Sequence, residues 1–303
     1  MESALIILNQ LLKMAIYCTI GFVLHRRNMI SKEGCKALST LLLYVILPCV
    51  LIASFIREKN PETTQVLIVS IIAGAILLAI SLAVSKLLYR KNSIDEFSAS
   101  FSNAGFMGMP LIASAYGNEK VFYIAAFTAY LNIFQWTYGQ RLLSKDEKIS
   151  VKSVLLNPLV ISLEIGLILY FTQIQIPEQI IGCISSISAC NGPIAMIILG
   201  FYIADIPIKE IFMFKQGYWV TTGRLVIIPL ISMLALKLIP NITNEVKQIM
   251  LIAACAPVGI NVAIYAQRLN QDYKRASILI CQSTILCVLT MPLIIGLSSI
   301  FFA

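Results

Sequence analysis

The chain of 303 residues is 58% hydrophobic and only 13% charged, with a mean hydropathy of +0.85. Soluble domains carry about 25% charged residues, so this composition excludes an ordinary soluble protein. Apolar runs such as 66–84 and 276–303 reach the roughly 20 residues that a helix needs to cross a bilayer. The expected fold class is therefore all-α and polytopic. The net charge of +8 is attributed to orientation in the lipid bilayer, and no nucleic acid is expected as a partner.

Ten apolar segments follow one another along the chain, and each is predicted to span the membrane. The predicted spans are 4–24, 36–56, 65–89, 97–116, 121–142, 155–173, 179–203, 217–239, 247–268 and 276–301. The connections after the odd-numbered spans carry sixteen Lys and Arg residues, whereas the opposite side carries five. Basic residues in short loops mark the cytoplasmic side. Both termini are therefore predicted to be extracytoplasmic, in a multi-pass protein of the plasma (inner) membrane.

Prolines inside the spans recur at nearly one spacing. Pro48 and Pro193 lie 145 residues apart, and Pro110 and Pro257 lie 147 residues apart. Five spans in each half is an odd number, so the second half is predicted to be inserted upside down, with repeats at 1–145 and 146–303. Inverted repeats of this kind are typical of secondary transporters. Coincidence is the alternative, because proline is common in membrane helices.

Spans four and nine contain residues that interrupt helices. They are Asn103, Gly105, Gly108 and Pro110 in span four, and Pro257, Gly259 and Asn261 in span nine. Proline removes a helical hydrogen bond and glycine permits other backbone angles, and in lipid such backbone is tolerated only against protein or a watery cavity. The two spans are therefore predicted to cross at their breaks, with their second halves starting at Pro110 and Pro257. Two simple proline kinks used for packing are the alternative.

The predicted crossing would bind an organic anion. Two half-helix N-termini would meet near the bilayer midplane, where unpaired N–H groups and partial positive charge favour a carboxylate. Asn103 and Asn261 offer amide donors beside the breaks. Asn132 and Gln135 in span five are candidates to face the same point, and hydrogen bonding between helices is their alternative role.

Lys13, Glu164 and Arg224 lie well inside the predicted spans, where charge is costly. A pair between Lys13 in span one and Glu164 in span six would relieve both burial costs, and proton carriage by the carboxylate is the alternative. Arg224 in span eight either attracts the anionic substrate or fixes helix ends through its rigid donor fork.

Cysteine and histidine patterns point to no metal and no cofactor. The eight cysteines form no CxxC pair, and a single histidine cannot supply the histidine pair of a zinc protease, so no enzymatic activity is expected. A cation/proton antiporter would need a carboxylate at the crossing, and neither break contains Asp or Glu. A bile-acid-symporter-like carrier and a channel are further alternatives.

Five segments resemble the auxin efflux carrier family, in matching order and over essentially the whole chain. They are FSNAGFMGMPLIASAYG (101–117), NPLVISLEIGLIL (157–169), GPIAMIILGFYIA (192–204), GRLVIIPL (223–230) and CAPVGINVAIYA (255–266). The family includes plant auxin exporters and bacterial permeases for malate, malonate and similar acids. The resemblance implies ten helices in two inverted repeats, with spans one, two, six and seven as a scaffold domain and spans three to five and eight to ten as a transport domain.

The resemblance also implies the function. A secondary carrier of a small organic anion that works by an elevator-like rearrangement is expected. The segment 145–152 is short, which favours a compact bacterial-type permease over a plant member. The anion, the direction of transport and the coupling ion, H⁺ or Na⁺, are left open, and a homodimer through the scaffold helices is a further expectation.

Overall fold

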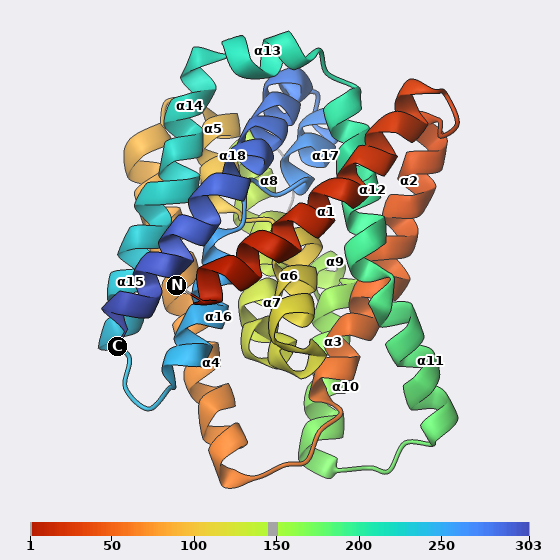
Figure 1. Ribbon diagram of the computed structural model, residues 1–303, viewed down its shortest axis with the longest axis vertical. Helices are drawn as coiled ribbons and strands as arrows, with labels where there is room; N and C mark the ends of the chain where they lie inside the picture. The colour runs from red at the N-terminus through yellow and green to blue at the C-terminus, as the bar shows by residue number, and fades with distance from the viewer. Residues whose placement is uncertain (1, 145–150, 303) are drawn as a thin grey trace.

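The computed structural model describes residues 2–144 and 151–302, and the regular secondary structure in this part of the chain is helical (Figure 1). The first half contains α1 (Glu2–Arg26), α2 (Lys32–Leu41), η1 (Leu42–Ile46), α3 (Leu47–Phe55), α4 (Pro61–Tyr89), α5 (Ser93–Ser100), η2 (Ala104–Gly108), α6 (Met109–Tyr116), η3 (Asn118–Ile124), α7 (Ala125–Phe134), η4 (Gln135–Gly139) and α8 (Gln140–Leu143). The second half contains α9 (Val151–Leu155), α10 (Pro158–Thr172), α11 (Glu178–Ala189), α12 (Asn191–Ala204), α13 (Ile208–Met213), α14 (Lys215–Thr222), η5 (Gly223–Ile227), α15 (Ile228–Leu238), α16 (Asn244–Cys255), α17 (Asn261–Arg268) and α18 (Tyr273–Phe301). The η3 segment is a 3₁₀-helix, and η1, η2, η4 and η5 are single π-turns within longer helices.

Within the described ranges, six helical segments are long and apolar enough to cross a membrane. They are Ala4–Arg26, Lys32–Phe55, Pro61–Tyr89, Glu178–Ala204, Lys215–Leu238 and Tyr273–Phe301. The prediction of an all-helical polytopic membrane protein is therefore confirmed. The other predicted spans correspond to shorter or interrupted helices: 97–116 is divided between α5 and α6, 121–142 covers η3 to α8, 155–173 is α10, and 247–268 is divided between α16 and α17.

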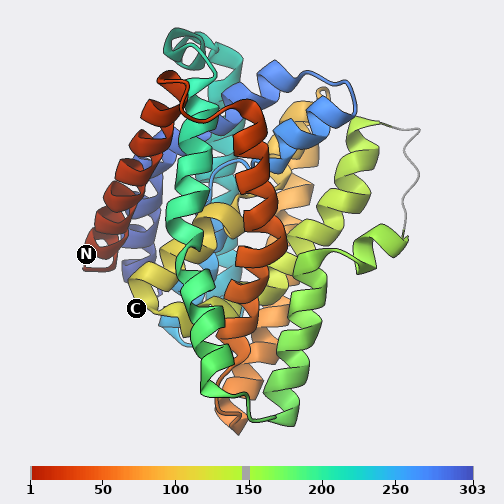
Figure 2. The same cartoon turned by 90° about the vertical axis from the view of Figure 1, so that its right-hand side faces the viewer.

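Helices α1 and α12 are far apart in sequence but lie side by side (Figures 1 and 2). Two glycines allow the backbones of α1 and α12 to approach closely. A Cβ atom on Gly21 would lie 2.0 Å from the carbonyl oxygen of Ile197, and one on Gly200 would lie 1.9 Å from that of Cys18. Real Cβ atoms never approach backbone this closely, so the two helices can touch only because both residues are glycine.

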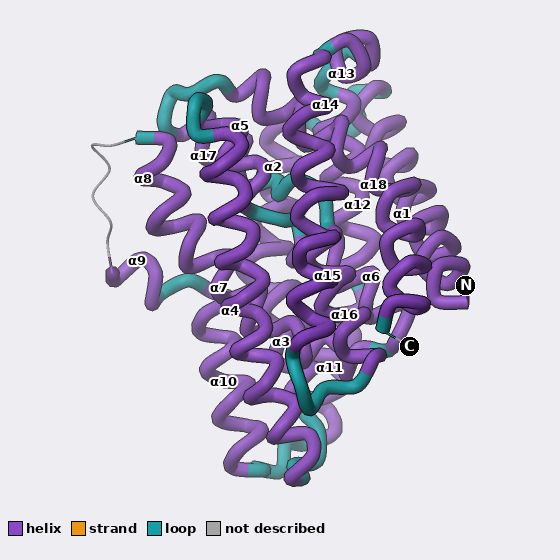
Figure 3. The backbone as a smooth tube through the Cα atoms, turned by 90° about the vertical axis from the view of Figure 1, so that its left-hand side faces the viewer, coloured by secondary structure: helices purple, strands orange, loops and turns teal. Residues whose placement is uncertain are grey.

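The loops gather at two ends of the helical bundle (Figures 1 and 3). At the end that carries α13, side chains in the helix ends and loops form ion pairs; at the other end, the start of η3 is joined to the start of α16. These pairs are Lys32–Asp205 (3.1 Å), Lys274–Glu210 (2.6 Å) and Arg275–Asp95 (2.7 Å) at the first end, and Lys120–Glu245 (2.9 Å) at the second. The predicted boundary between the halves, at 145/146, lies outside the described residues.

The glycine contact between α1 and α12 predicts that two Gly→Ala variants differ strongly in stability. Gly200→Ala would force the helix backbones apart and lower stability by about 1–3 kcal/mol, the usual cost of overpacking. Gly182→Ala on α11 is the matched control, because no atom lies within 4 Å of the added methyl group. Thermal unfolding of the purified protein in detergent checks this, and equal melting temperatures for the two variants would contradict it.

Candidate functional site

Two interrupted helices meet at the centre of the site. Helix α5 ends at Ser100 and helical structure resumes at Ala104, while α16 ends at Cys255 and α17 begins at Asn261. The unwound segments 101–103 and 257–259 run antiparallel and form a bridge between Ser102 and Val258. The N–H group of Asn103 donates to the carbonyl of Pro257 at 2.8 Å, and that of Gly259 donates to Phe101 at 3.0 Å. Backbone groups that lipid could not satisfy thus satisfy one another.

The breaks do not begin where the prolines predict. The second half of the first helix starts at Ala104, six residues before Pro110, and the second half of the other starts at Asn261, four residues after Pro257. Pro110 lies in the first turn of α6, directly after the π-turn η2, where the N–H of Met109 donates to the carbonyl of Ala104 five residues back. The wider turn accommodates the residue that has no N–H, so the helix continues through the proline.

A π-turn also precedes two other prolines in the described helices. The π-turns η1 and η5 precede Pro48 and Pro229, and in each the N–H of the residue before the proline donates to the carbonyl five residues back. Pro257 differs, because it lies within the unwound segment itself. Of these intramembrane prolines, Pro257 alone therefore marks a break among the described helices.

Five of the predicted binding residues line one small cavity at the crossing: Asn103, Gly105, Asn132, Gly259 and Asn261. Gln135 lines it too, and Asn261 donates to its side-chain oxygen at 2.5 Å. The Nδ2 of Asn132 donates to the carbonyl of Thr128 at 2.9 Å. The Nδ2 of Asn103, which is 2% exposed, has no hydrogen-bond partner among the described residues. The site thus presents an unused amide donor to the cavity.

The crossing cavity is closed in this structure. Its volume is about 20 Å³, which is room for a single water molecule but not for an organic acid. A second cavity of about 120 Å³ adjoins it and shares Asn132 and Asn261 as lining residues. That cavity extends along α17 to Tyr265 and Arg268. The sequence analysis did not single out Arg268, and its position two helical turns after Asn261 is the signal that could have placed it here.

The charge around the crossing favours negative ligands. None of the described residues that line the crossing cavity carries a carboxylate. The helices that begin at Ala104 and Asn261 direct their N-terminal ends, with partial positive charge, toward this point. A group of three or more His, Cys, Asp or Glu side chains suited to a metal ion is also absent from the described residues. The arrangement can donate hydrogen bonds to an anion.

Arg224 lies behind the crossing and binds the other ends of the two interrupted helices. The side chain is 1% exposed, and its guanidinium donates to the carbonyl of Ala99 at 3.0 Å and to the carbonyl of Ala254. It also donates to the hydroxyl of Ser81 at 2.9 Å. Because α5 ends at Ser100 and α16 at Cys255, the cation meets the C-terminal, partially negative end of both helices. The geometry matches the predicted role in fixing helix ends, and Arg224 lines neither of the two cavities.

The remaining predicted site residues lie away from the crossing cavity. Gly108 packs toward α16, where an added Cβ would lie 3.6 Å from the Cα of Ala253. Lys13 and Pro110 line a separate, larger cavity. Glu164 is exposed on α10, and no ion pair joins it to Lys13 within the described part of the chain. The two residues occupy helices that pack against different neighbours, α1 on α12 and α10 on α3.

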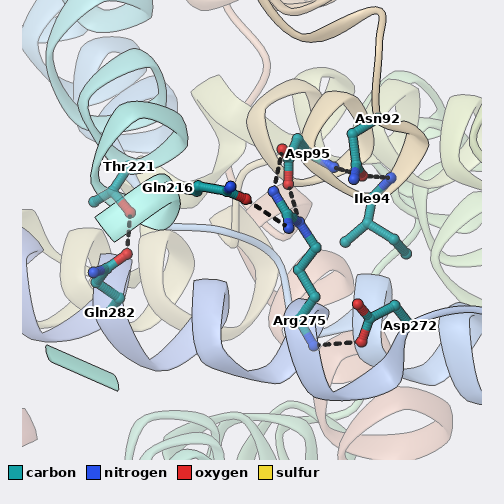
Figure 4. A network of polar contacts seen from close by, with 8 residues as sticks. All are labelled: Asn92, Ile94, Asp95, Gln216, Thr221, Asp272, Arg275 and Gln282. Carbon is teal, nitrogen blue, oxygen red and sulfur yellow. Dashed lines mark hydrogen bonds and ion pairs between the residues drawn. The ribbon is translucent and has the colours of Figure 1, made fainter. Parts of the chain in front are cut away.

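A polar network that the sequence analysis missed holds the start of α5 (Figure 4). Arg275 of α18 forms two hydrogen bonds of 2.7 Å with Asp95 and one of 3.2 Å with Gln216 of α14. Asn92 caps α5 through its side-chain oxygen. One turn further, the hydroxyl of Tyr138 donates to Glu96 at 2.5 Å. These contacts fix the short helix that leads into the crossing, so they position the site without lining it.

Comparison with known proteins identifies the protein family. A family model described as "Membrane transport protein" matches residues 6–154 and 147–295. This match confirms the resemblance to the auxin efflux carrier family. A protein of Rhizobium meliloti (strain 1021) named "Putative malonate transporter" is 24% identical over 289 residues, covering 90% of this chain and 89% of that protein.

Arg224 yields a stability prediction. Arg224→Met would leave two buried helix-end carbonyls without their donor, at about 1–3 kcal/mol each. Arg224→Lys would keep the charge but lose the planar fork that reaches both helices, so it would rescue only part of the loss. Thermal unfolding in detergent measures the stability of both variants. Arg90→Lys, at an exposed position after α4, is the control, and an Arg224→Lys variant as stable as the parent protein would contradict the bridging role.

Proposed function

This chain belongs to the membrane transport protein family, and from that premise we propose that it is a secondary active transporter of a small organic anion, such as a mono- or dicarboxylate. One observation carries the proposal. Two helix N-termini and the unpaired amide donor of Asn103 converge on a cavity whose described lining contains no carboxylate. An anion is the ligand that such donors stabilise. A cation/proton antiporter would require an acidic residue at this point.

The proposed architecture is a bundle of ten spans in two inverted repeats. The four shorter or interrupted segments would complete the six long helices, and the pairing of segments 101–103 and 257–259 supports a correspondence between spans four and nine. Helices α1, α2–α3, α10 and α11–α12 would form the scaffold, and the others the transport domain. The described connections after spans one, three, seven and nine, which carry basic residues, meet at one end through ion pairs, and this supports a cytoplasmic position for that end and an extracytoplasmic position for both termini in the plasma membrane.

Alternating access by an elevator-like movement is the proposed mechanism. The crossing cavity is too small for a carboxylic acid in this conformation, since small-molecule sites usually measure about 300–1,000 Å³. The adjoining cavity with Arg268 would lead from the cytoplasmic end to Asn261 and attract the anion electrostatically. Movement of the transport helices against the scaffold would enlarge the crossing cavity and change the side from which it is reached.

Transport in proteoliposomes tests the proposal. Because the relative from Rhizobium meliloti is named for malonate, malonate heads a panel of radiolabelled mono- and dicarboxylates, tested under imposed Na⁺ and pH gradients. Saturable accumulation that depends on one of the gradients is expected, and the effective gradient identifies the coupling ion. Unsaturable flux would indicate a channel instead, and failure of every carboxylate would remove the proposed substrate class.

The crossing residues give the sharper prediction. Asn103→Ala and Asn261→Ala would each remove an amide from the cavity and reduce carboxylate uptake roughly ten-fold or more, the usual value of a hydrogen bond to a charged group. Asn244→Ala, an exposed position at the start of α16, is the matched control and should leave uptake unchanged. Uptake is normalised to protein inserted in the liposomes. Undiminished uptake by both crossing variants would refute the binding role.

A further inference from the structure

A cavity with several polar side chains in its lining lies away from the crossing and is much larger than the crossing cavity. It measures about 530 Å³ and lies between α1, α6 and the junction of α11 with α12. It shares no lining residue with the crossing cavity or with the cavity beside Arg268. Gly105 and Phe106, at the start of the helix Ala104–Tyr116, line the crossing cavity, whereas later residues of that helix, Pro110 and Ser114, line this one.

Lys13 supplies this cavity with its charge. The residue lies near the middle of α1, a helix long and apolar enough to span the membrane, where an ammonium group is costly unless it meets polar surroundings or a counter-charge. The surroundings are polar, with the side chains of Gln10, Tyr17, Ser114, Asn118, Ser185 and Ser188 in the lining. No carboxylate is found among the lining residues, and none of the described acidic side chains pairs with Lys13.

Asn191 provides an independent sign of a missing ligand. This residue begins α12, lines the cavity and is 2% exposed. Neither its amide nitrogen nor its amide oxygen has a hydrogen-bond partner within the described chain. An unpaired buried amide destabilises a protein, since the lost hydrogen bonds to water are not replaced. A ligand that accepts a hydrogen bond from Nδ2 would remove that cost.

We propose that this cavity is a second carboxylate site, distinct from the crossing, in which Lys13 pairs with the carboxylate and Asn191 donates a hydrogen bond to it. The volume falls within the range of small-molecule sites, and the lining carries one positive charge and several donors. Asn118 places the cavity toward the start of η3, at the end of the bundle opposite α13. The site would therefore capture or release the anion on the extracytoplasmic side. For the class of ligand, this inference rests on the proposed function.

Equilibrium binding separates the two sites. Radiolabelled acetate, malonate and succinate are titrated against the full-length protein purified in detergent, for the parent chain, Lys13→Met, Asn191→Leu and the double variant Asn103→Ala/Asn261→Ala. For at least one acid, the double variant should retain a binding site, and adding Lys13→Met or Asn191→Leu to it should weaken that binding at least about ten-fold. Lys13→Arg should retain binding. Lys86→Met, which removes a lysine at an exposed position on α4, should leave binding unchanged.

A stability measurement distinguishes a ligand site from a structural role. If Asn191 serves a ligand, Asn191→Leu should lose binding while its melting temperature without ligand stays equal to or above that of the parent protein. The inference is overturned if the double variant binds no acid that the parent chain binds, or if binding in the double variant is insensitive to Lys13→Met. A third outcome is that binding depends on Lys13 while the crossing amides affect neither binding nor uptake. That result would refute the crossing site and support the site of Lys13 and Asn191.

Discussion

Backbone hydrogen bonding in a medium without water is the constraint on which this structure depends. Each unwound segment exposes N–H and C=O groups that lipid cannot satisfy. Segments 101–103 and 257–259 solve this by bonding to each other, through Asn103 to Pro257 and Gly259 to Phe101. Serine side chains complete the set, since Ser283 accepts from the N–H of Val258 and Ser81 donates to the carbonyl of Ser100. Neither helix can be interrupted alone, so the two breaks form a single structural unit.

The four helix ends at this unit have different partners, and this difference determines the charge that the cavity presents. The two C-terminal ends, with partial negative charge, are bound by the guanidinium of Arg224. The two N-terminal ends instead face the cavity that Asn103 and Asn261 line. Because the cation neutralises only the negative ends, the positive ends are left for a ligand. In the proposed function, the interaction that holds the broken helices together would therefore also favour an anion as the occupant, without any basic side chain in the described lining.

The sequence predicted the right segments for a reason that was partly wrong. Proline rules placed the breaks at Pro110 and Pro257, but π-turns carry the helix through Pro48, Pro110 and Pro229. The first break falls instead at Phe101–Asn103, where only the pairing with a segment some 155 residues later unwinds the chain, and a local rule cannot detect such pairing. No Lys13–Glu164 ion pair occurs among the described residues, and equivalent places in two sequence halves need not be neighbours in space. Amide side chains beside the breaks were the reliable signal, since hydrogen-bonding residues are costly in lipid unless they face a cavity or a partner.

The helix Ala104–Tyr116 contributes to both proposed anion sites, and this has a thermodynamic consequence. Its first turn lines the crossing cavity, and its later turns line the cavity of Lys13 and Asn191. A displacement of this helix against α1 and α12 would alter the shape of both cavities at once. If the two sites prefer different positions of the helix, an anion at one site changes the affinity of the other by a reciprocal factor. An anion held by Lys13 would then favour the conformation that fits it, so that the outer site would influence the position of the transport domain as well as collect its substrate.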